Sequence, residues 1–271
     1  MDQEARYDRI AEGYAAWWSP IHRPATLRVL DEVAGDGRPV AGLLDVGCGT
    51  GAMAREAAAR WPGARVTGVD ISAGMLAIAE RETAALPAGA GGQLRYAQAP
   101  ADRLPFLDGA FDVVVSAFVL QLVPSRPRAL REMRRVLRPG GLLACVTWLD
   151  GGSLGADRVY DKTLAAFGLE PRDGIGHDDL ASPAAAVAQL RRAGFADARA
   201  HGDELVHRFT PEGYLGFVTR FDDEDLFATL DQETWQALEE DLLGRLRALP
   251  PRDLEMRLPI VYATGRRSDG R

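Results

Sequence analysis

The chain has 271 residues, of which 46% are hydrophobic and 26% charged, so it can bury a large core and is not intrinsically disordered. Its 39 acidic side chains outnumber 32 basic ones, and the net charge of −7 argues against nucleic-acid binding, which depends on phosphate neutralisation. There is no apolar run of about 18 residues and the start is polar, so we expect no membrane span, no secretory signal and a cytoplasmic location.

Cysteines and acidic clusters do not predict a metal centre. Cys48 and Cys145 are too few and too far apart for a disulfide framework or a metal cluster. The run of residues 221–227 holds four successive carboxylates, which cannot all face one ion, and indicates a solvated helix start. We therefore expect reduced thiols and no metal. The basic stretch 126–135 is interpreted as an outer helix face.

Strands and helices are predicted to alternate along the first 149 residues. Apolar positions at helical spacing predict a helix over residues 4–18, which Pro20 and Pro24 then end. Further on, strands are predicted over residues 41–46, 65–70, 93–98, 111–117 and 142–149, and helices over 52–61, 73–85 and 126–138. This alternation is typical of right-handed βαβ units and of a parallel sheet covered on both faces.

The second half is less regular but returns to the same plan. It is predicted to contain strands over residues 197–209 and 258–265 and helices over 157–167, 184–193, 211–221, 224–230 and 233–249. We expect an α/β fold: a Rossmann-like, doubly wound, mostly parallel seven-stranded sheet with helices on both faces. Residues 1–271 are interpreted as one domain, with helical insertions at 150–182 and 210–250 that are natural places for a substrate cap.

The stretch LLDVGCGTG, residues 43–51, carries the first chemical signal. A buried strand ends at Asp45, and glycines follow at 47, 49 and 51, where a strand must turn sharply into a helix and a ligand can touch the backbone. The next strand ends at Asp70, where a carboxylate is placed to accept hydrogen bonds from both hydroxyls of a ribose. The pattern predicts a bound nucleoside at the carboxyl ends of the strands.

A dinucleotide site is the alternative interpretation of these glycines. Gly47, Gly49 and Ala52 also satisfy the pattern G-x-G-x-x-A, which alone would suit a nicotinamide-dependent oxidoreductase. Asp45 opposes that interpretation, because its charge would repel a pyrophosphate and attract an ammonium or a sulfonium. The turn also holds no Arg or Lys. A tight turn without a ligand is the third possibility.

Four motifs in a fixed order carry a resemblance to a known family. They are LDVGCGTG at residues 44–51, VDIS at 69–72, RLPFLDGAFDVVVSAFVLQLV at 103–123 and VLRPGGLL at 136–143. With these motifs the chain resembles the class I S-adenosylmethionine-dependent methyltransferases, in the type 11 branch that is similar to ubiquinone and menaquinone biosynthesis enzymes. The resemblance covers residues 5–149 and implies a cofactor-binding half at 41–149, behind an N-terminal helical cap at 1–40. It implies methyl transfer from S-adenosylmethionine to a small organic acceptor by direct in-line displacement, which leaves S-adenosylhomocysteine.

The resemblance also implies which residues bind the cofactor. They are Tyr14, Asp45, Gly47, Gly49, Gly51, Asp70, Ile71, Met75, Ala101, Asp102 and Ser116. Tyr14, from the segment YDRIAEGY, would close over the cofactor, and the glycines would line its methionine portion. Asp45 would engage the amino group and Asp70 the ribose. Ile71 and Met75 would pack on the adenine, and Ser116 would lie beside the sulfonium.

One departure concerns adenine recognition. Family members usually carry an acid followed by Ala shortly before LPF, whereas this chain has Pro100 and Ala101, followed by Asp102. Adenine recognition would then fall to the backbone of Ala101 or to Asp102. The departure also keeps open a second alternative, a non-catalytic cofactor-binding subunit of a methyltransferase complex.

The sequence gives only candidates for the acceptor side. Many relatives carry a histidine pair where this chain has Gln121 and Leu122, so His22 and His177 are the candidates for a general base. The expected partner is a small-molecule acceptor, and neither its identity nor the oligomeric state can be inferred. An apolar pocket over the transferring methyl is predicted from Trp17, Trp18, Phe118 and Gln121, with Trp148 and Phe167 as further aromatic candidates.

Overall fold

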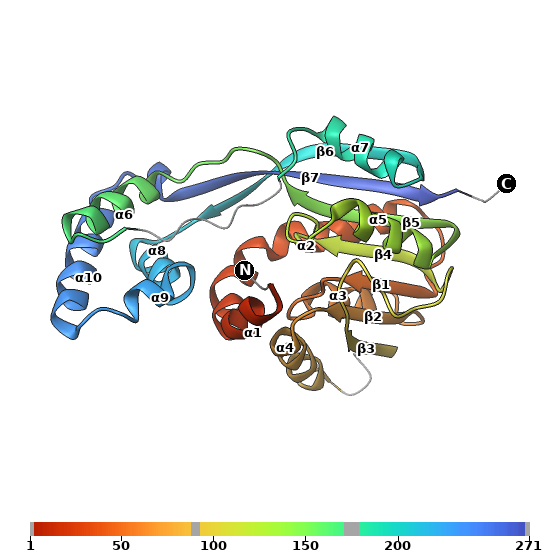
Figure 1. Cartoon of the computed structure of the whole chain (residues 1–271), viewed down its shortest axis with the longest axis horizontal. Helices are drawn as coiled ribbons and strands as arrows, with labels where there is room; N and C mark the ends of the chain where they lie inside the picture. The colour runs from red at the N-terminus through yellow and green to blue at the C-terminus, as the bar shows by residue number, and fades with distance from the viewer. Residues whose placement is uncertain (1–2, 88–92, 171–178, 269–271) are drawn as a thin grey trace.

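Seven strands form one sheet in the order β3-β2-β1-β4-β5-β7-β6 (Figure 1). The computed structural model describes residues 3–87, 93–170 and 179–268. The strands are β1 (Gly42–Val46), β2 (Arg65–Asp70), β3 (Gln93–Gln98), β4 (Phe111–Ala117), β5 (Leu137–Trp148), β6 (Phe195–Arg208) and β7 (Glu255–Arg267). The first five pair in parallel, and β7 runs antiparallel to both its neighbours. The predicted mostly parallel, seven-stranded sheet is confirmed.

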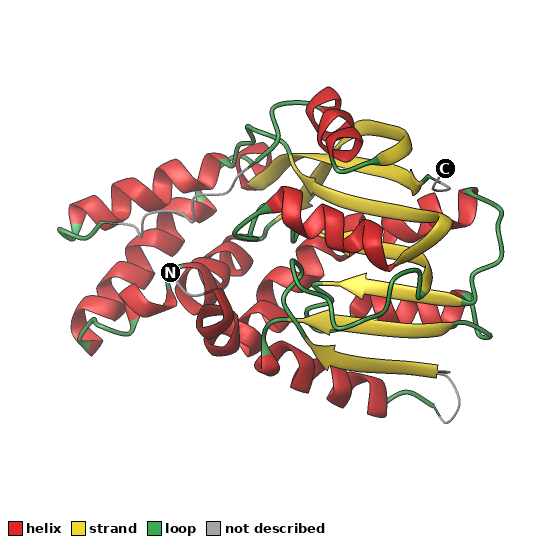
Figure 2. Ribbon diagram, turned by 45° about the vertical axis from the view of Figure 1, so that its right-hand side comes forward, coloured by secondary structure: helices red, strands yellow, loops and turns green. Residues whose placement is uncertain are grey.

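Helices cover both faces of the sheet, as Figure 2 shows. On one face lie α2 (Ser19–Gly35) and α3 (Ala52–Arg60), and on the other α5 (Arg126–Val136) and α7 (Pro183–Arg192), while α4 (Ala73–Ala84) packs beside β2 and β3. Successive residues of a strand point to opposite faces, so Leu43 joins the core under α2 and α3 and Leu44 the core under α5 and α7. Both are fully buried, which explains why β1 is an unbroken apolar run up to its acid.

The N-terminal helices differ from the prediction. Helix α1 (Gln3–Gly13) passes through a π-helical turn, η1 (Tyr14–Trp18), directly into α2, so the chain stays helical past both prolines. Pro20 lies in the first turn of α2 and Pro24 further along it, and each removes one backbone N–H from the continuous helix. Val29 and the other buried apolar residues of α2 pack on the sheet, and this packing outweighs the cost of the internal proline.

The two predicted helical insertions lie together at one end of the molecule. They contain α6 (Gly155–Ala166), α8 (Pro211–Phe217), η2 (Val218–Asp222), α9 (Glu224–Phe227), α10 (Gln232–Arg247) and η3 (Pro251–Leu254). Strand β7 pairs with β5 only as far as Ile260, whereas β6 and β7 stay paired to Arg208 and Glu255, so they leave the sheet as a two-stranded ribbon. Figure 1 shows the helices beyond the end of this ribbon, where α6 packs against α10.

Within the described residues, no helix is long and apolar enough to cross a membrane.

Candidate functional site

A cavity opens at the carboxyl ends of the central strands. The chain winds outward from β1 to β2 and β3 and then returns to β4 on the other side of β1, which creates the crevice where doubly wound sheets bind ligands. Eight predicted cofactor residues line the cavity: Tyr14, Gly47, Gly49, Asp70, Ile71, Met75, Ala101 and Asp102. Strand ends, the N-terminal helices and the loop after β3 therefore converge on one site.

The glycine turn shows why each glycine is there. Gly47, with φ of 70°, has no room for a side chain, because a Cβ would lie 2.2 Å from Cγ2 of Val119. Gly49, with φ of 53°, would meet nothing within 4 Å, so its open face borders the cavity. Gly51 instead packs behind the turn, since a Cβ there would lie 2.4 Å from the hydroxyl of Tyr96. The structure therefore places only the first two glycines at the cavity wall.

Asp70 is anchored by the backbone and still faces the cavity. One carboxylate oxygen accepts a hydrogen bond from the N–H of Gly49 at 2.8 Å, and the other accepts from the N–H of Ser72 at 3.0 Å. Burial raises the pKa of Asp70, and these backbone donors oppose the rise. Each oxygen keeps a free lone pair, so the carboxylate can accept two further hydrogen bonds from a vicinal diol.

Asp45 and Ser116 lie behind the cavity rather than in its wall. Neither oxygen of the fully buried Asp45 carboxylate has a hydrogen-bond partner of ordinary geometry. Burial, reinforced by the charge of Asp70 and only weakly opposed by the N–H of Ala54, raises the pKa of Asp45 to about 8. Ser116, also fully buried, donates to the carbonyl of Val46 at 2.8 Å and so ties β4 to β1. Because its hydroxyl is buried and bonded to the backbone, Ser116 is not placed to contact a sulfonium in the cavity.

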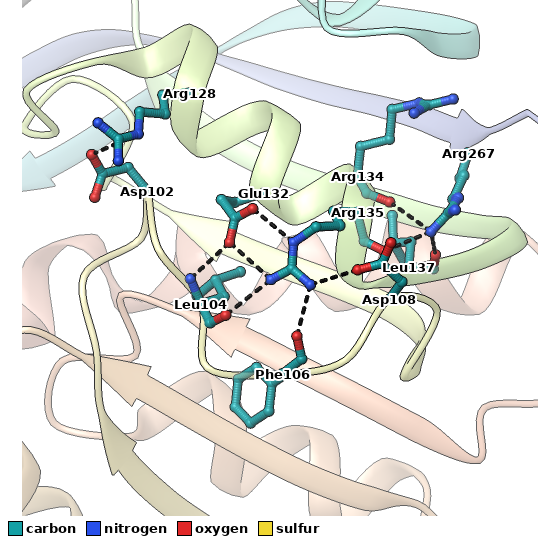
Figure 3. Close-up of polar contacts among 10 residues, drawn as sticks. All are labelled: Asp102, Leu104, Phe106, Asp108, Arg128, Glu132, Arg134, Arg135, Leu137 and Arg267. Carbon is teal, nitrogen blue, oxygen red and sulfur yellow. Dashed lines mark hydrogen bonds and ion pairs between the residues drawn. The ribbon is translucent and has the colours of Figure 1, made fainter.

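The loop after β3 is held in place by side chains of α5, as Figure 3 shows. Arg135 donates to the carbonyls of Leu104 at 2.9 Å and Phe106 at 2.7 Å, and Glu132 accepts from the N–H of Leu104 at 2.9 Å. Arg135 also pairs with Asp108 at 2.8 Å. The basic stretch expected to form an outer helix face thus turns this arginine inward, toward the carbonyls of the loop.

Ala101 and Asp102 project from the start of that loop into the cavity. One carboxylate oxygen of Asp102 lies 3.7 Å from the guanidinium of Arg128, so α5 holds this side chain as well (Figure 3). The loop that departs from the family pattern is therefore a fixed part of the wall.

A second cavity continues from the first and has aromatic walls. The two share Tyr7, Tyr14, Phe118 and Leu122, and the second adds Trp18, Gln121, Trp148, Leu149, Gly151, Asp179, Leu258 and Pro259. Phe118, just after β4, has a positive φ of 56°, a conformation that aromatic residues rarely adopt, and its ring stacks on Trp148 with centroids 4.1 Å apart. The strained backbone directs this ring between the two cavities.

Three of the four residues predicted for the acceptor pocket line the second cavity. Trp18, Phe118 and Gln121 line the second cavity, but Trp17 turns away and packs on Gly216 of α8. The amide of Gln121 donates to the carbonyl of Phe118 at 2.7 Å and accepts from the hydroxyl of Thr147 at 2.7 Å. These two hydrogen bonds fix the amide group in the cavity wall, so the apolar part of the Gln121 side chain faces the cavity.

His22 is buried beside the site and bonded to Tyr14. Its Nε2 lies 2.6 Å from the Tyr14 hydroxyl and its Nδ1 lies 3.1 Å from Oγ1 of Thr26. Burial lowers the pKa of His22 to about 4, so the ring is neutral at pH 7. The other predicted base, His177, lies outside the described residues.

Tyr7 and Asp179 are among the lining residues that were not predicted. Tyr7 lines both cavities, and its spacing of seven residues from Tyr14 puts both on one helix face, a signal that the sequence does contain. Asp179 lines the second cavity, but no pattern in the sequence around it could have singled it out. Among the described residues, no group of three or more His, Cys, Asp or Glu is placed to hold a metal ion.

Known proteins match this chain either over nearly its whole length or over about half of it. A family model described as "Methyltransferase domain" matches residues 44–145. Nocamycin O-methyltransferase of Saccharothrix syringae is 30% identical over 96% of each chain. Demethylmenaquinone methyltransferase of Symbiobacterium thermophilum is 38% identical, over 52% of this chain and 56% of that one. The first relative therefore aligns through the insertions, whereas the second aligns over only about half of its length.

A solved structure extends the likeness in fold. Phosphoethanolamine N-methyltransferase 2 of Haemonchus contortus, in complex with phosphomonomethylethanolamine and S-adenosylhomocysteine, has a TM-score of 0.52. It is 20% identical and covers 89% of this chain and 52% of that one, a level at which only the fold is shared.

Proposed function

The chain belongs to the S-adenosylmethionine-dependent methyltransferases, and from this premise we propose that it methylates a small, apolar organic acceptor by direct in-line displacement. The observation that carries the proposal is the meeting of two cavities. One has the polar groups that a nucleoside needs, the other has aromatic walls, and they join at Tyr14 and Phe118.

The residues of the first cavity fit S-adenosylmethionine. Gly49 leaves backbone open to the ligand, Asp70 keeps two lone pairs for a ribose, and Ile71 and Met75 offer apolar surface for an adenine. The buried carboxyl of Asp45 behind the turn is neutral in the free protein, because burial raises its pKa to about 8, and it can ionise when an amino group approaches. We propose these residues, with Ala101 and Asp102 at the adenine end, as the cofactor-binding set.

When bound, the cofactor supplies a methyl group already activated by its positively charged sulfur. The protein's remaining task is to hold the acceptor in line and exclude water, and such positioning can lower a barrier by roughly 7–11 kcal/mol at best. Phe118 and Trp148 form a stacked pair along the second cavity, and Trp18 lies 6.2 Å from Trp148, centroid to centroid. These rings form a rigid, dry wall that suits a flat acceptor.

The helical insertions are proposed as the acceptor cap. Trp18 packs against Phe217 of α8 and Phe221 of η2, so the inner wall of the second cavity rests on the group of helices at the end of the ribbon. The relative that aligns through these helices is named as an O-methyltransferase, whereas the relative that matches only about half its length acts on a demethylmenaquinone by its name. A small acceptor enclosed between the sheet and this cap is the simplest arrangement, and a cytoplasmic location stays a prediction.

Two measurements test the proposal. Isothermal titration calorimetry should show binding of S-adenosylhomocysteine and none of NADH, since the glycine turn holds no Arg or Lys that could pair with a pyrophosphate. Incubation with S-adenosylmethionine and one- to three-ring aromatic hydroxyl compounds and amines should then give methylated product by mass spectrometry. Binding of NADH with no response to S-adenosylhomocysteine would overturn the proposal, and binding without transfer to any acceptor would favour a non-catalytic cofactor-binding subunit.

A further inference from the structure

We propose that Tyr14 and His22 form a proton relay that removes the proton of the acceptor, and that the methylated atom is therefore a hydroxyl oxygen. This inference rests on the proposed function and names the acceptor class of the same site. Tyr14 is the catalytic residue because it lines both cavities, and His22 acts through it.

The geometry forms a continuous chain of hydrogen-bonding groups leading out of the cavity. The Tyr14 hydroxyl lies 2.6 Å from Nε2 of His22, and Nδ1 of that ring lies 3.1 Å from Oγ1 of Thr26, four residues further along α2. The π-helical turn that begins at Tyr14 widens the helix just before His22, and π-helical segments are frequent at functional sites. The rings of Trp18 and Phe118 enclose the imidazole, with centroids 5.8 and 5.4 Å away.

The direction of the relay follows from the neutral ring. Because a buried neutral imidazole has one donor and one acceptor, Tyr14 can donate to Nε2 only if Nδ1 carries the proton and donates to Thr26. The phenolic oxygen then keeps its lone pairs for a hydroxyl group that enters the cavity. This arrangement leaves the relay ready to accept one proton from the cavity side.

Burial among uncharged groups keeps His22 neutral before the reaction. Tyr14 is the titratable group that faces the ring, since the other groups against it, Thr26, Trp18 and Phe118, are uncharged. Asp70 and Tyr7 face Tyr14 and, together with burial, raise its pKa, so the phenol is also neutral at rest. The cofactor's positive charge disfavours a second one on His22. Methyl transfer removes that charge, and the imidazole can then take the proton.

The step balances as follows. The acceptor oxygen forms a bond to the methyl carbon as the sulfur–carbon bond breaks and its electron pair stays on sulfur. The acceptor's proton moves to the Tyr14 oxygen while the Tyr14 proton moves to Nε2 of His22. The single positive charge is on sulfur before the step and on the imidazolium of His22 after it. His22 releases its proton when the products depart.

This relay predicts a hydroxyl acceptor because other nucleophiles do not need it. An amine attacks with its lone pair while neutral, whereas a hydroxyl with a high pKa attacks well only as its proton is removed. Asp179, also in the wall of the second cavity, is the competing base, so the experiments must separate it from the relay.

The first experiment needs no acceptor. In full-length protein labelled with ¹⁵N-histidine and saturated with S-adenosylhomocysteine, the His22 resonances should show the neutral Nδ1–H tautomer from pH 5 to 8.5. Tyr14→Phe should shift the Nε2 resonance while leaving the affinity for S-adenosylhomocysteine within a few-fold. An Nε2–H tautomer, or a titration midpoint near 6.5, would overturn the relay. If the wild-type protein does not bind S-adenosylhomocysteine, that result would instead count against the proposed function.

The second experiment uses phenols, enols and aryl amines of one to three rings with S-adenosylmethionine. Turnover is expected on hydroxyl groups, and Tyr14→Phe and His22→Gln should lower kcat about 10²–10⁴-fold. Gln can still hold the Tyr14 hydroxyl but cannot take its proton, so the His22→Gln rate should rise about tenfold per pH unit where the wild-type rate is flat.

The matched control is His207→Gln on the β6–β7 ribbon, which should keep the wild-type rate and pH profile. An unchanged rate in His22→Gln would overturn the relay, and a large loss in Asp179→Asn beside it would identify Asp179 as the base instead. Methylation of amines alone would overturn the acceptor class.

Discussion

Replacing Asp45 with Asn should stabilise the cofactor-free protein, and the gain should grow with pH. The carboxyl group is fully buried without a hydrogen-bond partner of ordinary geometry, and its pKa of about 8 in the folded protein compares with 3.8 for an exposed aspartate. Between these two values the folded state binds a proton that the unfolded state has lost. Wild-type stability therefore falls as pH rises from about 4 to about 8.

The magnitude follows from the two pKa values. Each pH unit between them costs about 1.4 kcal/mol, so the destabilisation grows with pH and reaches about 4 kcal/mol at pH 7. Asn has the shape and donor of the protonated acid but cannot ionise, so Asp45→Asn should match the wild type near pH 4 and exceed it by this growing amount above. The free energy of unfolding, measured by urea denaturation at pH 4, 5, 6, 7 and 8, checks this.

The same substitution should weaken cofactor binding. If an amino group approaches the glycine turn, ionised Asp45 attracts it, so binding at pH 7 should release close to one proton. Calorimetry with S-adenosylhomocysteine in buffers of different ionisation enthalpy measures that release, which should vanish in Asp45→Asn. A stability difference between the two proteins that does not change with pH would refute the reasoning, because it would mean that Asp45 is ionised in the folded state throughout.

Four further substitutions test the wall of the first cavity. Asp70→Asn should lower the affinity for S-adenosylhomocysteine at least tenfold and also lower the melting temperature without ligand, since an amide cannot accept from both backbone N–H groups; an unchanged melting temperature would contradict this. Arg135→Met should speed hydrogen exchange of residues 103–109 and weaken S-adenosylhomocysteine binding several-fold, and unchanged exchange would show that the loop holds itself. Gly47→Ala should be recovered unfolded because of the clash with Val119, whereas Gly49→Ala should fold and lose affinity for S-adenosylhomocysteine; equal damage would refute the assignment of open space to Gly49.

Chemistry carried by neighbouring residues could be predicted from the sequence. The glycines after Asp45 and the acid at Asp70 follow strand ends, and parallel strands bring their carboxyl ends to one edge, so the pattern places the ligand without coordinates. Which glycine faces the ligand could not be predicted in this way. Gly51 has the same residue type and a positive φ, but Tyr96, from a different strand, fills the space beside it.

The same distinction holds for the helices. A proline inside a helical pattern predicts an end, and the local cost is real, but α2 continues through Pro24 because its apolar face packs on the sheet. The inward turn of Arg135 is another case, since no property of α5 alone says that the carbonyls of a loop lie against it.

What the sequence by itself determined is the alternation of strands and helices, the nucleotide-type turn and the family, because each depends on residues close in the chain or on motifs in a fixed order. Only the tertiary structure decided which side chains meet across elements. Tyr14 reaches His22 through a π-helical turn, Asp45 is buried unpaired under the glycine turn, and two insertions far apart in the chain pack as one group. Such contacts depend on the packing of distant segments, which fixes burial and hydrogen-bond partners and which no local pattern records.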